Sequence, residues 1–419
     1  MKPLAETALY SFYFRSFILR KKRLDHDLVL RRIRKKGIAS VAFIVSSLPM
    51  WRGQGLLDLL LKDSRFKVSV MLLPFASYSS HEKEECLQNI HAYFAGKGIP
   101  VEDLGKRDCP EQYLREVLNP DILFYPQQYY WLYENGLDSF KFEDKLLCFI
   151  PYSLNIINEP WIFNQRFSNV AWRLFYPTPF DKEAAEKYAL NKGQNVRVVG
   201  NPTADLFLAN SHVYAWKSQE KVKKKIIWAP HFSIEEGGFI YRGSFLLIYN
   251  EMLQIAKRYR DHFQFVFKPH PRLATELYKH PDWGKERTNA YYQEWAVGEN
   301  TQLETGSYID LFMTSDAMIH DCVSFTAEYH YSHNPTFFFT TNIEQTERQL
   351  NTLGLNALHA HYIGSETQDI IDFLENVVLN GNDSMKDTRQ AFFNHYLLPI
   401  DGRSVAENIH QEIVTSIWN

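Results

Sequence analysis

The sequence predicts an α/β protein built from two doubly wound, Rossmann-like parallel-sheet domains that face each other across a cleft. Short β-branched and aromatic runs alternate with helical stretches in both halves of the chain, which is typical of parallel sheets covered by helices. The chain has 419 residues, enough for two domains of ordinary size. Its residues are 45% hydrophobic, so both domains can bury a core.

In the first half, apolar runs predict strands and the stretches between them predict helices. The predicted strands cover residues 37–45, 66–74, 121–125, 146–150 and 172–176. The predicted helices cover residues 55–62, 81–96 and 181–192, the last with Asp181 as its cap. These elements form a first domain over residues 37–205, preceded by a basic and aromatic helical segment over residues 1–36.

The second half repeats this alternation after a lysine-rich segment, Lys217–Lys225, that is predicted to be a surface linker. The predicted strands cover residues 225–229, 263–268, 316–320 and 335–340. The predicted helices cover residues 244–260, 307–313 and 324–332. They form a second domain over residues 222–383, and the helical tail at 384–419 is expected to pack back on the first domain.

Composition excludes several classes of protein. The net charge of -3 argues against nucleic acid as a partner. None of the four cysteines forms a CxxC pair, so free thiols and no cysteine metal site are predicted. No stretch approaches 18 apolar residues, so no transmembrane helix is predicted and the expected location is the cytoplasm.

The N-terminus differs from the rest of the chain in charge. Residues 1–40 contain eleven Lys/Arg and three Asp/Glu, and the stretch Leu9–Phe14 is aromatic. This composition predicts that residues 9–36 rest on an anionic membrane surface, at the inner face of the cell membrane. The alternative is a solvated basic helix that leads into the first strand.

Polar residues follow two predicted strands of the second half. His231 follows the strand at 225–229, and Lys268, His270 and Arg272 follow the strand at 263–268. A third block, residues 315–328, surrounds the end of the strand at 316–320. Ligands of open α/β sheets bind at the carboxyl ends of strands. Histidine, lysine and arginine gathered there predict an anionic ligand, and phosphate is the commonest one.

Residues 196–340 resemble the CDP-glycerol glycerophosphotransferase family of teichoic-acid and capsule polyol-phosphate transferases, which have a GT-B fold. The resemblance rests on an Ala-Pro turn in Trp228-Ala-Pro-His231, on the His-Pro turn His270-Pro271, and on the block from Asp316 to Glu328 closed by Asn334-Pro335. Val199-Gly-Asn-Pro202 with Asp205 also resembles the interdomain turn of GT-B enzymes and their epimerase relatives.

The resemblance implies a transferase that moves a polyol phosphate, such as glycerol phosphate, from a CDP-activated donor to a hydroxyl of a cell-surface glycan or lipid-linked precursor and releases CMP. No cofactor or metal is expected, because cationic side chains and N–H groups at a helix start can neutralise the two phosphates. The predicted catalytic residues are His231 and His270. The predicted substrate-binding residues are Lys268, Arg272, Asn201, Asp321, Cys322, Val323, Ser324, Phe325 and Glu328.

The chain departs from the family at its general base. The family carries a His-Gly pair at the end of a strand in the first domain, whereas the matching stretch, Phe149–Leu154, has no histidine. Tyr152 and Ser153 are poor bases at neutral pH. The acid/base role falls to His231 or Glu159, or catalysis rests mainly on positioning and charge stabilisation, which phosphoryl transfer tolerates.

Two other functions compete with this interpretation. One is a GT-B glycosyltransferase or sugar-nucleotide epimerase that uses a UDP- or GDP-sugar. The other is a non-catalytic relative that kept the fold. Plainer structural roles compete for single residues: Asp321 as a helix cap, and His320 as a core or surface histidine. The remaining histidines of this region are expected to be scattered over the surface: His330, His333, His359 and His361.

Overall fold

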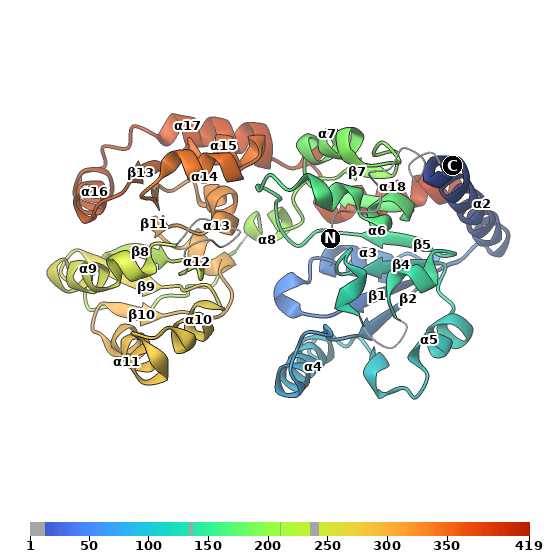
Figure 1. The fold of residues 1–419 in the computed structure, drawn as a ribbon, viewed down its shortest axis with the longest axis horizontal. Coiled ribbons are helices and arrows are strands. Elements are labelled where there is room, and N and C mark those ends of the chain that lie inside the picture. The colour runs from blue at the N-terminus through green and yellow to red at the C-terminus, as the bar shows by residue number, and fades with distance from the viewer. Residues whose placement is uncertain (1–12, 134–136, 210, 235–242) are drawn as a thin grey trace. The chain divides into compact units, whose positions relative to one another are not determined.

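The computed structural model describes residues 13–133, 137–209, 211–234 and 243–419. The chain divides into two compact units, each with its own sheet (Figure 1). The first unit comprises Met1–Ser153, Glu159–Asp205 and Pro399–Asn419, and the second comprises Leu154–Asn158 and Leu206–Leu398. The predicted tail at 384–419 is therefore divided between the two units.

The first unit contains a seven-stranded parallel sheet in the order β3-β2-β1-β4-β5-β6-β7. Its strands are β1 (Ala39–Val45), β2 (Phe66–Leu72), β3 (Val101–Asp103), β4 (Ile122–Tyr125), β5 (Leu146–Phe149), β6 (Arg173–Tyr176) and β7 (Val196–Val198). Helices cover both faces of the sheet, so the central strands are nearly continuous apolar runs. The strand order reverses between β1 and β4, as in doubly wound folds.

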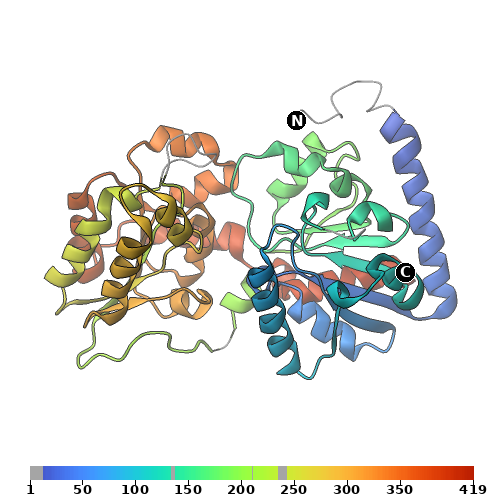
Figure 2. The same ribbon diagram turned by 60° about the horizontal axis from the view of Figure 1, so that its bottom comes forward.

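The helices of the first unit surround this sheet. They are α2 (Leu19–Lys36), α3 (Gln54–Lys62), α4 (Ser80–Ala95), α5 (Pro110–Gln112), α6 (Arg166–Val170), α7 (Pro179–Tyr188) and α18 (Val405–Trp418), with α8 (Ala204–Phe207) at the end of the unit. A π-helical turn, Phe14–Ile18, leads directly into α2. Figure 2 shows α2 as a long helix along one side of the unit.

The C-terminal helix α18 belongs to the core of the first unit. Its residues Ile409, Ile413 and Ile417 are buried in the same cluster as Val41 of β1 and Leu57 of α3. The carboxylate of Asp205 accepts hydrogen bonds from the backbone N–H groups of Val405 (2.9 Å) and Ala406 (3.2 Å), the first two residues of α18. The acid thus satisfies donors that a helix start leaves without partners.

The predicted cap of α7 is wrong. Thr178, not Asp181, is the N-cap: its hydroxyl accepts the N–H of Asp181, while the Asp181 carboxylate accepts the backbone N–H (3.0 Å) and the hydroxyl (2.7 Å) of Thr178. Pro179 occupies the first helical position, which suits a residue without an N–H. The helix also ends at Tyr188, four residues before the predicted end.

The second unit contains a six-stranded parallel sheet in the order β10-β9-β8-β11-β12-β13. Its strands are β8 (Lys224–Ala229), β9 (Phe263–Phe267), β10 (Thr301–Leu303), β11 (Ala317–His320), β12 (Thr336–Phe339) and β13 (Tyr362–Gly364). The prediction of two doubly wound parallel sheets is therefore confirmed. The order places β8 between β9 and β11, so the segments that follow these three strands are neighbours.

Nine α-helices are described in the second unit, and three of them (α13, α16 and α17) continue directly into a turn of another helical type. They are α9 (Phe245–Arg258), α10 (Leu273–Lys279), α11 (Gly284–Val297), α12 (Ile309–Met313), α13 (Val323–Glu328), α14 (Ile343–Gln349), α15 (Thr352–Leu358), α16 (Thr367–Asp372) and α17 (Lys386–Phe392), with α8 entering from the first unit. An aromatic core that includes Trp228 and Phe267 lies between the sheet and α9 and α11.

No helix in the described parts of the chain is both long and apolar enough to cross a membrane.

Candidate functional site

Three neighbouring strands of the second sheet end at one edge. β8 pairs with β9 through Trp228 and Phe267, and with β11 through Ala229 and His320. The segments that follow these strands carry His231, the stretch Lys268–Arg272 and the stretch Asp321–Phe325. The structure therefore brings together most of the side chains that the sequence predicted for an anion site.

Asp321 joins two of these segments. One carboxylate oxygen accepts the backbone N–H of His231 (2.6 Å), and the other accepts the backbone N–H of Ser244. Burial raises the pKa of Asp321, and these hydrogen bonds oppose the increase. Cys322, not Asp321, is the N-cap of α13, so the alternative role of Asp321 as a helix cap is wrong.

The two candidate catalytic histidines lie side by side. The centroids of the His231 and His270 rings are 5.1 Å apart, and the Phe232 ring lies 4.3 Å from the first and 4.5 Å from the second. The Arg272 guanidinium stacks over Phe232, with Cζ 4.1 Å from the ring centroid. An aromatic ring thus holds two imidazoles and a guanidinium in one cluster.

Both histidines are neutral at pH 7 in the free protein. Burial, with a contribution from the Arg272 charge, lowers the pKa of His231 to about 4. Burial, with His231 and the charges of Arg272 and Lys268, lowers the pKa of His270 to about 3. The Nδ1 atoms accept the backbone N–H groups of Ser233 (3.3 Å) and Arg272 (3.1 Å), respectively. Each neutral ring therefore carries its proton on Nε2 and presents an N–H donor.

The two other cations of the predicted site differ in their surroundings. Lys268 is buried, and its ammonium donates to the Gly306 carbonyl (2.8 Å). Burial lowers the pKa of Lys268. Arg272 is exposed and pairs with Glu276 at 3.2 Å. The Arg272 side chain is therefore open to solvent, whereas the buried Lys268 side chain holds the backbone at Gly306.

The α13 segment places its predicted ligand-binding residues at different depths. Ser324 is exposed, Val323 and Phe325 are half-buried, and Cys322 and Glu328 are buried. Burial raises the pKa of the Cys322 thiol to about 12, so this cysteine is not a nucleophile at neutral pH.

Glu328 is held inside the protein. Its carboxylate accepts the Tyr308 hydroxyl at 2.8 Å. Phe325 packs on the Tyr308 and Phe312 rings, with centroids 5.2 and 4.9 Å apart. The contacts of Tyr308 with Glu328 and Phe325 could not be predicted from the sequence block at residues 315–328, because Tyr308 lies outside that block.

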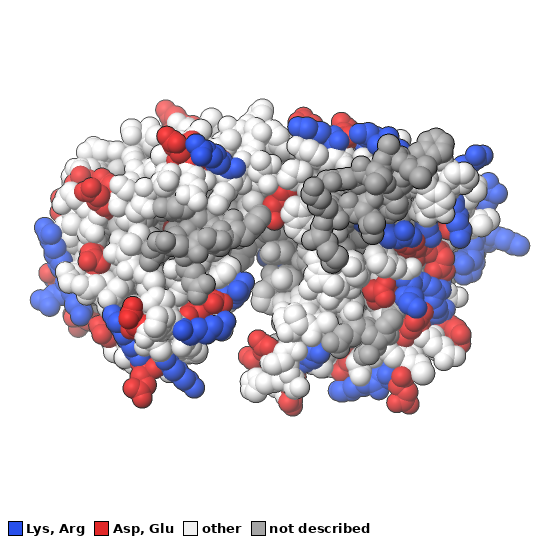
Figure 3. Space-filling model, in the orientation of Figure 1, with Lys and Arg blue, Asp and Glu red and all other residues white. Residues whose placement is uncertain are grey.

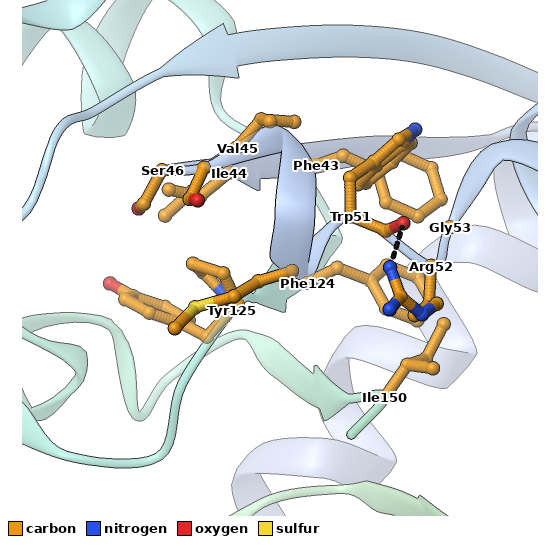
Figure 4. Close-up of a pocket in the computed structure, with 13 residues that line it drawn as sticks. Phe43, Ile44, Val45, Ser46, Trp51, Arg52, Gly53, Phe124, Tyr125 and Ile150 are labelled. Atoms are coloured by element: carbon orange, nitrogen blue, oxygen red, sulfur yellow. Dashed lines mark hydrogen bonds between the residues drawn. The ribbon is translucent and has the colours of Figure 1, made fainter. Parts of the chain in front are cut away.

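The remaining predicted residues lie in the first unit. The Asn201 carboxamide accepts the backbone N–H of Thr203 (3.1 Å) in the turn after β7. Glu159 is half-buried, and burial raises its pKa. A small cavity of about 30 Å³ lies at the carboxyl ends of β1 and β4, beside Trp51 and Phe124 (Figure 4). It can hold a water molecule but not a nucleotide.

The expectation of scattered surface histidines is wrong for His330 and His361. Both are buried with His320, which makes His320 a core residue. The Nε2 atoms of His320 and His361 are 3.1 Å apart, and Nδ1 of His361 bonds the Ala357 carbonyl at 2.8 Å. His359, in contrast, is exposed and pairs with Glu347. Among the described residues, no group of three His, Cys, Asp or Glu side chains is arranged to hold a metal ion.

Comparison with known proteins identifies one matching family, and the similar solved structures share one fold. Residues 172–415 match the family model for CDP-glycerol:poly(glycerophosphate) glycerophosphotransferases. No curated protein sequence matches the chain significantly.

Solved structures of two kinds share the fold. A variant of the wall teichoic acid polymerase TagF is 13% identical with a TM-score of 0.58, covering 99% of this chain and 100% of its own. The UDP-GlcNAc 2-epimerase from Neisseria meningitidis bound to UDP-GlcNAc is 16% identical with a TM-score of 0.56, covering 90% of this chain and 100% of its own. The S. aureus MnaA–UDP co-structure is 14% identical with a TM-score of 0.57, covering 91% and 97%. These similarities show the GT-B fold.

Replacing Asp321 tests whether its carboxylate holds the segments after β8 and β11 together. Asp321→Ala leaves the N–H groups of His231 and Ser244 without their acceptor, at a cost of about 1–3 kcal/mol for each buried donor. We expect urea unfolding to show this loss, whereas Glu344→Ala, at an exposed acid of α14, leaves the free energy of unfolding unchanged. Equal stability of Asp321→Ala and the unmodified protein would contradict the role assigned to this carboxylate.

Proposed function

The chain belongs to the CDP-glycerol:poly(glycerophosphate) glycerophosphotransferase family, and we propose that its second unit binds the CDP-activated polyol at the carboxyl edge of the second sheet. The observation that carries this proposal is the cluster of His231, His270 and Arg272 at the ends of β8 and β9. Two imidazole N–H donors and an exposed guanidinium suit the two adjacent phosphates of a CDP-polyol.

The reaction is a displacement at phosphorus. A hydroxyl oxygen of the acceptor attacks the distal phosphorus of the donor, the bond from that phosphorus to the oxygen of CMP breaks, and CMP leaves. The proton of the attacking hydroxyl passes to the leaving CMP phosphate or to water. Negative charge accumulates on the leaving phosphate. Donors fixed before the substrate arrives lower the barrier, because they need no reorganisation during the reaction. His270 and Arg272 supply these donors in the proposed site.

The hydrogen bonds of the histidines favour charge stabilisation over general-base catalysis by His231. A general base needs a free lone pair, but Nδ1 of His231 accepts from Ser233, and Nε2 carries the proton. Burial and, to a lesser extent, neighbouring cations lower the pKa of both rings in the free protein. A bound phosphate raises the pKa of each ring, because a nearby negative charge favours the protonated form. We propose that His231 and His270 gain positive charge as the donor binds, and that transfer relies on positioning and electrostatics.

The fold is shared with UDP-sugar epimerases, but the family match favours phosphoryl transfer. The epimerase likeness is one of structure at 16% identity or less, whereas the family match covers residues 172–415 and includes the whole histidine cluster. A glycosyl acceptor or lipid-linked precursor is the proposed source of the attacking hydroxyl.

We further propose that α2 rests on an anionic membrane surface, where a lipid-linked acceptor is located. Residues 9–12 of the proposed segment lie outside the described residues. Beyond them, four apolar side chains are exposed: Tyr13 at 52%, Phe17 at 60%, Leu24 at 58% and Leu28 at 63%. Lys and Arg side chains gather over the same helix, at the right-hand edge of Figure 3. An exposed apolar stripe with basic flanks is typical of helices that lie in a membrane interface.

His270 is the test of the donor site. His270→Asn keeps an acceptor for the Arg272 N–H but loses the ring N–H donor, and we expect transfer to slow by about 10²–10³-fold, as for other charge-stabilising donors. His262→Asn, at an exposed histidine, is the matched control.

The same variant is expected to change how CDP-glycerol affinity depends on pH. Because the free-protein pKa values of about 3 and 4 rise on binding, the complex takes up protons and CDP-glycerol affinity increases as pH falls from 7 toward 5. His270→Asn should weaken this dependence in calorimetric titrations. Turnover by His270→Asn at the rate of the unmodified enzyme would contradict the proposed site.

Vesicle binding tests the membrane face. A double variant, Leu24→Glu with Leu28→Glu, places two carboxylates in the apolar stripe and should abolish co-sedimentation with vesicles of phosphatidylcholine and phosphatidylglycerol. Leu61→Glu, at a leucine of α3 that is 51% exposed, should bind like the unmodified protein. Binding should also weaken with added salt. Equal binding of the double variant, or equal binding to vesicles without phosphatidylglycerol, would contradict the proposal.

A further inference from the structure

Three aromatic rings form an exposed stack in the first unit. The Tyr129 ring lies 5.0 Å from the Trp131 ring at an interplanar angle of 26°, and 5.7 Å from the Trp161 ring at 31°. Trp131 is 51% exposed and Trp161 is 42% exposed. Large rings left in water at one place on a protein usually mark a binding surface.

The stack lies where the first sheet binds ligands in a doubly wound fold. Tyr129 and Trp131 follow β4, and Trp161 lies in the connection between β5 and β6, so the rings belong to the connections that follow two neighbouring strands. The cluster is also anchored. Gln128, which precedes Tyr129, is buried and accepts the Ser168 hydroxyl at 2.7 Å.

Polar groups that suit hydroxyls border the stack. Glu159, which is half-buried, lies two residues before Trp161. Burial raises the pKa of the Tyr129 hydroxyl, and the nearby Glu159 charge adds to this increase. Tyr152, which is 38% exposed, also lies near the Tyr129 hydroxyl. The surface therefore combines flat aromatic faces with a carboxylate and phenol groups at its border.

A sugar ring matches this combination. The C–H groups on one face of a pyranose are weakly positive and pack on the negative face of an aromatic ring, while its hydroxyls donate to carboxylates. A phosphate-bearing chain fits less well, because the Glu159 charge repels it. The same charge disfavours an anionic membrane surface, although exposed Trp and Tyr side chains also occur at membrane interfaces.

We propose that Tyr129, Trp131 and Trp161 hold a neutral sugar ring of the acceptor, with Glu159 accepting hydrogen bonds from its hydroxyls. The inference rests on the transferase function proposed above, because it takes the sugar to be part of the acceptor. It narrows the acceptor class: the portion bound by the first unit is an uncharged glycan, not a polyol phosphate.

The test uses N,N′-diacetylchitobiose, a neutral disaccharide, as the probe. Saturation-transfer NMR and titration should show that it binds the full-length protein, and that Trp131→Ala and Trp161→Ala each lose affinity by about tenfold. Tyr188→Ala, which removes an aromatic side chain that is 37% exposed elsewhere in the first unit, should bind like the unmodified protein. Glycerol 3-phosphate should not compete with the disaccharide.

Three results would overturn the inference: no binding of the disaccharide to the unmodified protein, equal binding by the two tryptophan variants, or a loss of vesicle binding in these variants while sugar binding persists. The last result would assign the stack to the membrane face. Melting temperatures of the variants verify that they are folded.

CDP-glycerol titrations on the same proteins separate this inference from the proposed function. The tryptophan variants should bind CDP-glycerol with unchanged affinity, because the proposed donor site is in the second unit. If the unmodified protein binds the sugar through the stack but does not bind CDP-glycerol, the proposed donor site fails and the sugar site stands. If the unmodified protein binds CDP-glycerol and the tryptophan substitutions leave disaccharide affinity unchanged, only the proposed sugar site is wrong.

Discussion

The proposed donor site depends on one buried carboxylate. Asp321 directly follows β11, one of the two central strands. Its carboxylate accepts the N–H groups of His231 and Ser244, which fixes the segment after β8 against the segment after β11. Without this acceptor, two buried backbone donors would have no partner. The position of His231, and through the ring contacts that of Phe232 and His270, follows from it.

Burial sets the charge of the site. The site holds two imidazoles, a buried ammonium and a guanidinium close together. If all four carried a positive charge, their repulsion and burial would destabilise the fold. The fold avoids this cost by keeping His231 and His270 neutral and by directing Lys268 to a backbone carbonyl. In the proposed mechanism, the pyrophosphate of the donor supplies the negative charge that makes protonation of the rings favourable, so that donor binding and proton uptake are coupled.

The sequence was sufficient to predict the longer strands and the gathering of polar residues at their ends, because apolar runs of four or more residues carry a periodic signal. Edge strands of three residues, such as β13 (Tyr362–Gly364), carry too little signal to be found. The burial of His330 and the hydrogen bond from Tyr308 to Glu328 depend on contacts between distant segments. The aromatic stack was missed for the same reason, since Trp161 reaches Tyr129 only in the folded chain.

Donor preference tests the central claim most directly. Calorimetric titration of the purified protein with CDP-glycerol and, separately, with UDP-N-acetylglucosamine measures it without knowledge of the acceptor. The account predicts saturable binding of CDP-glycerol that weakens strongly in the His270→Asn variant, and no comparable binding of the UDP-sugar. Binding of UDP-N-acetylglucosamine alone would contradict the account and assign the histidine cluster to chemistry at carbon instead of phosphorus.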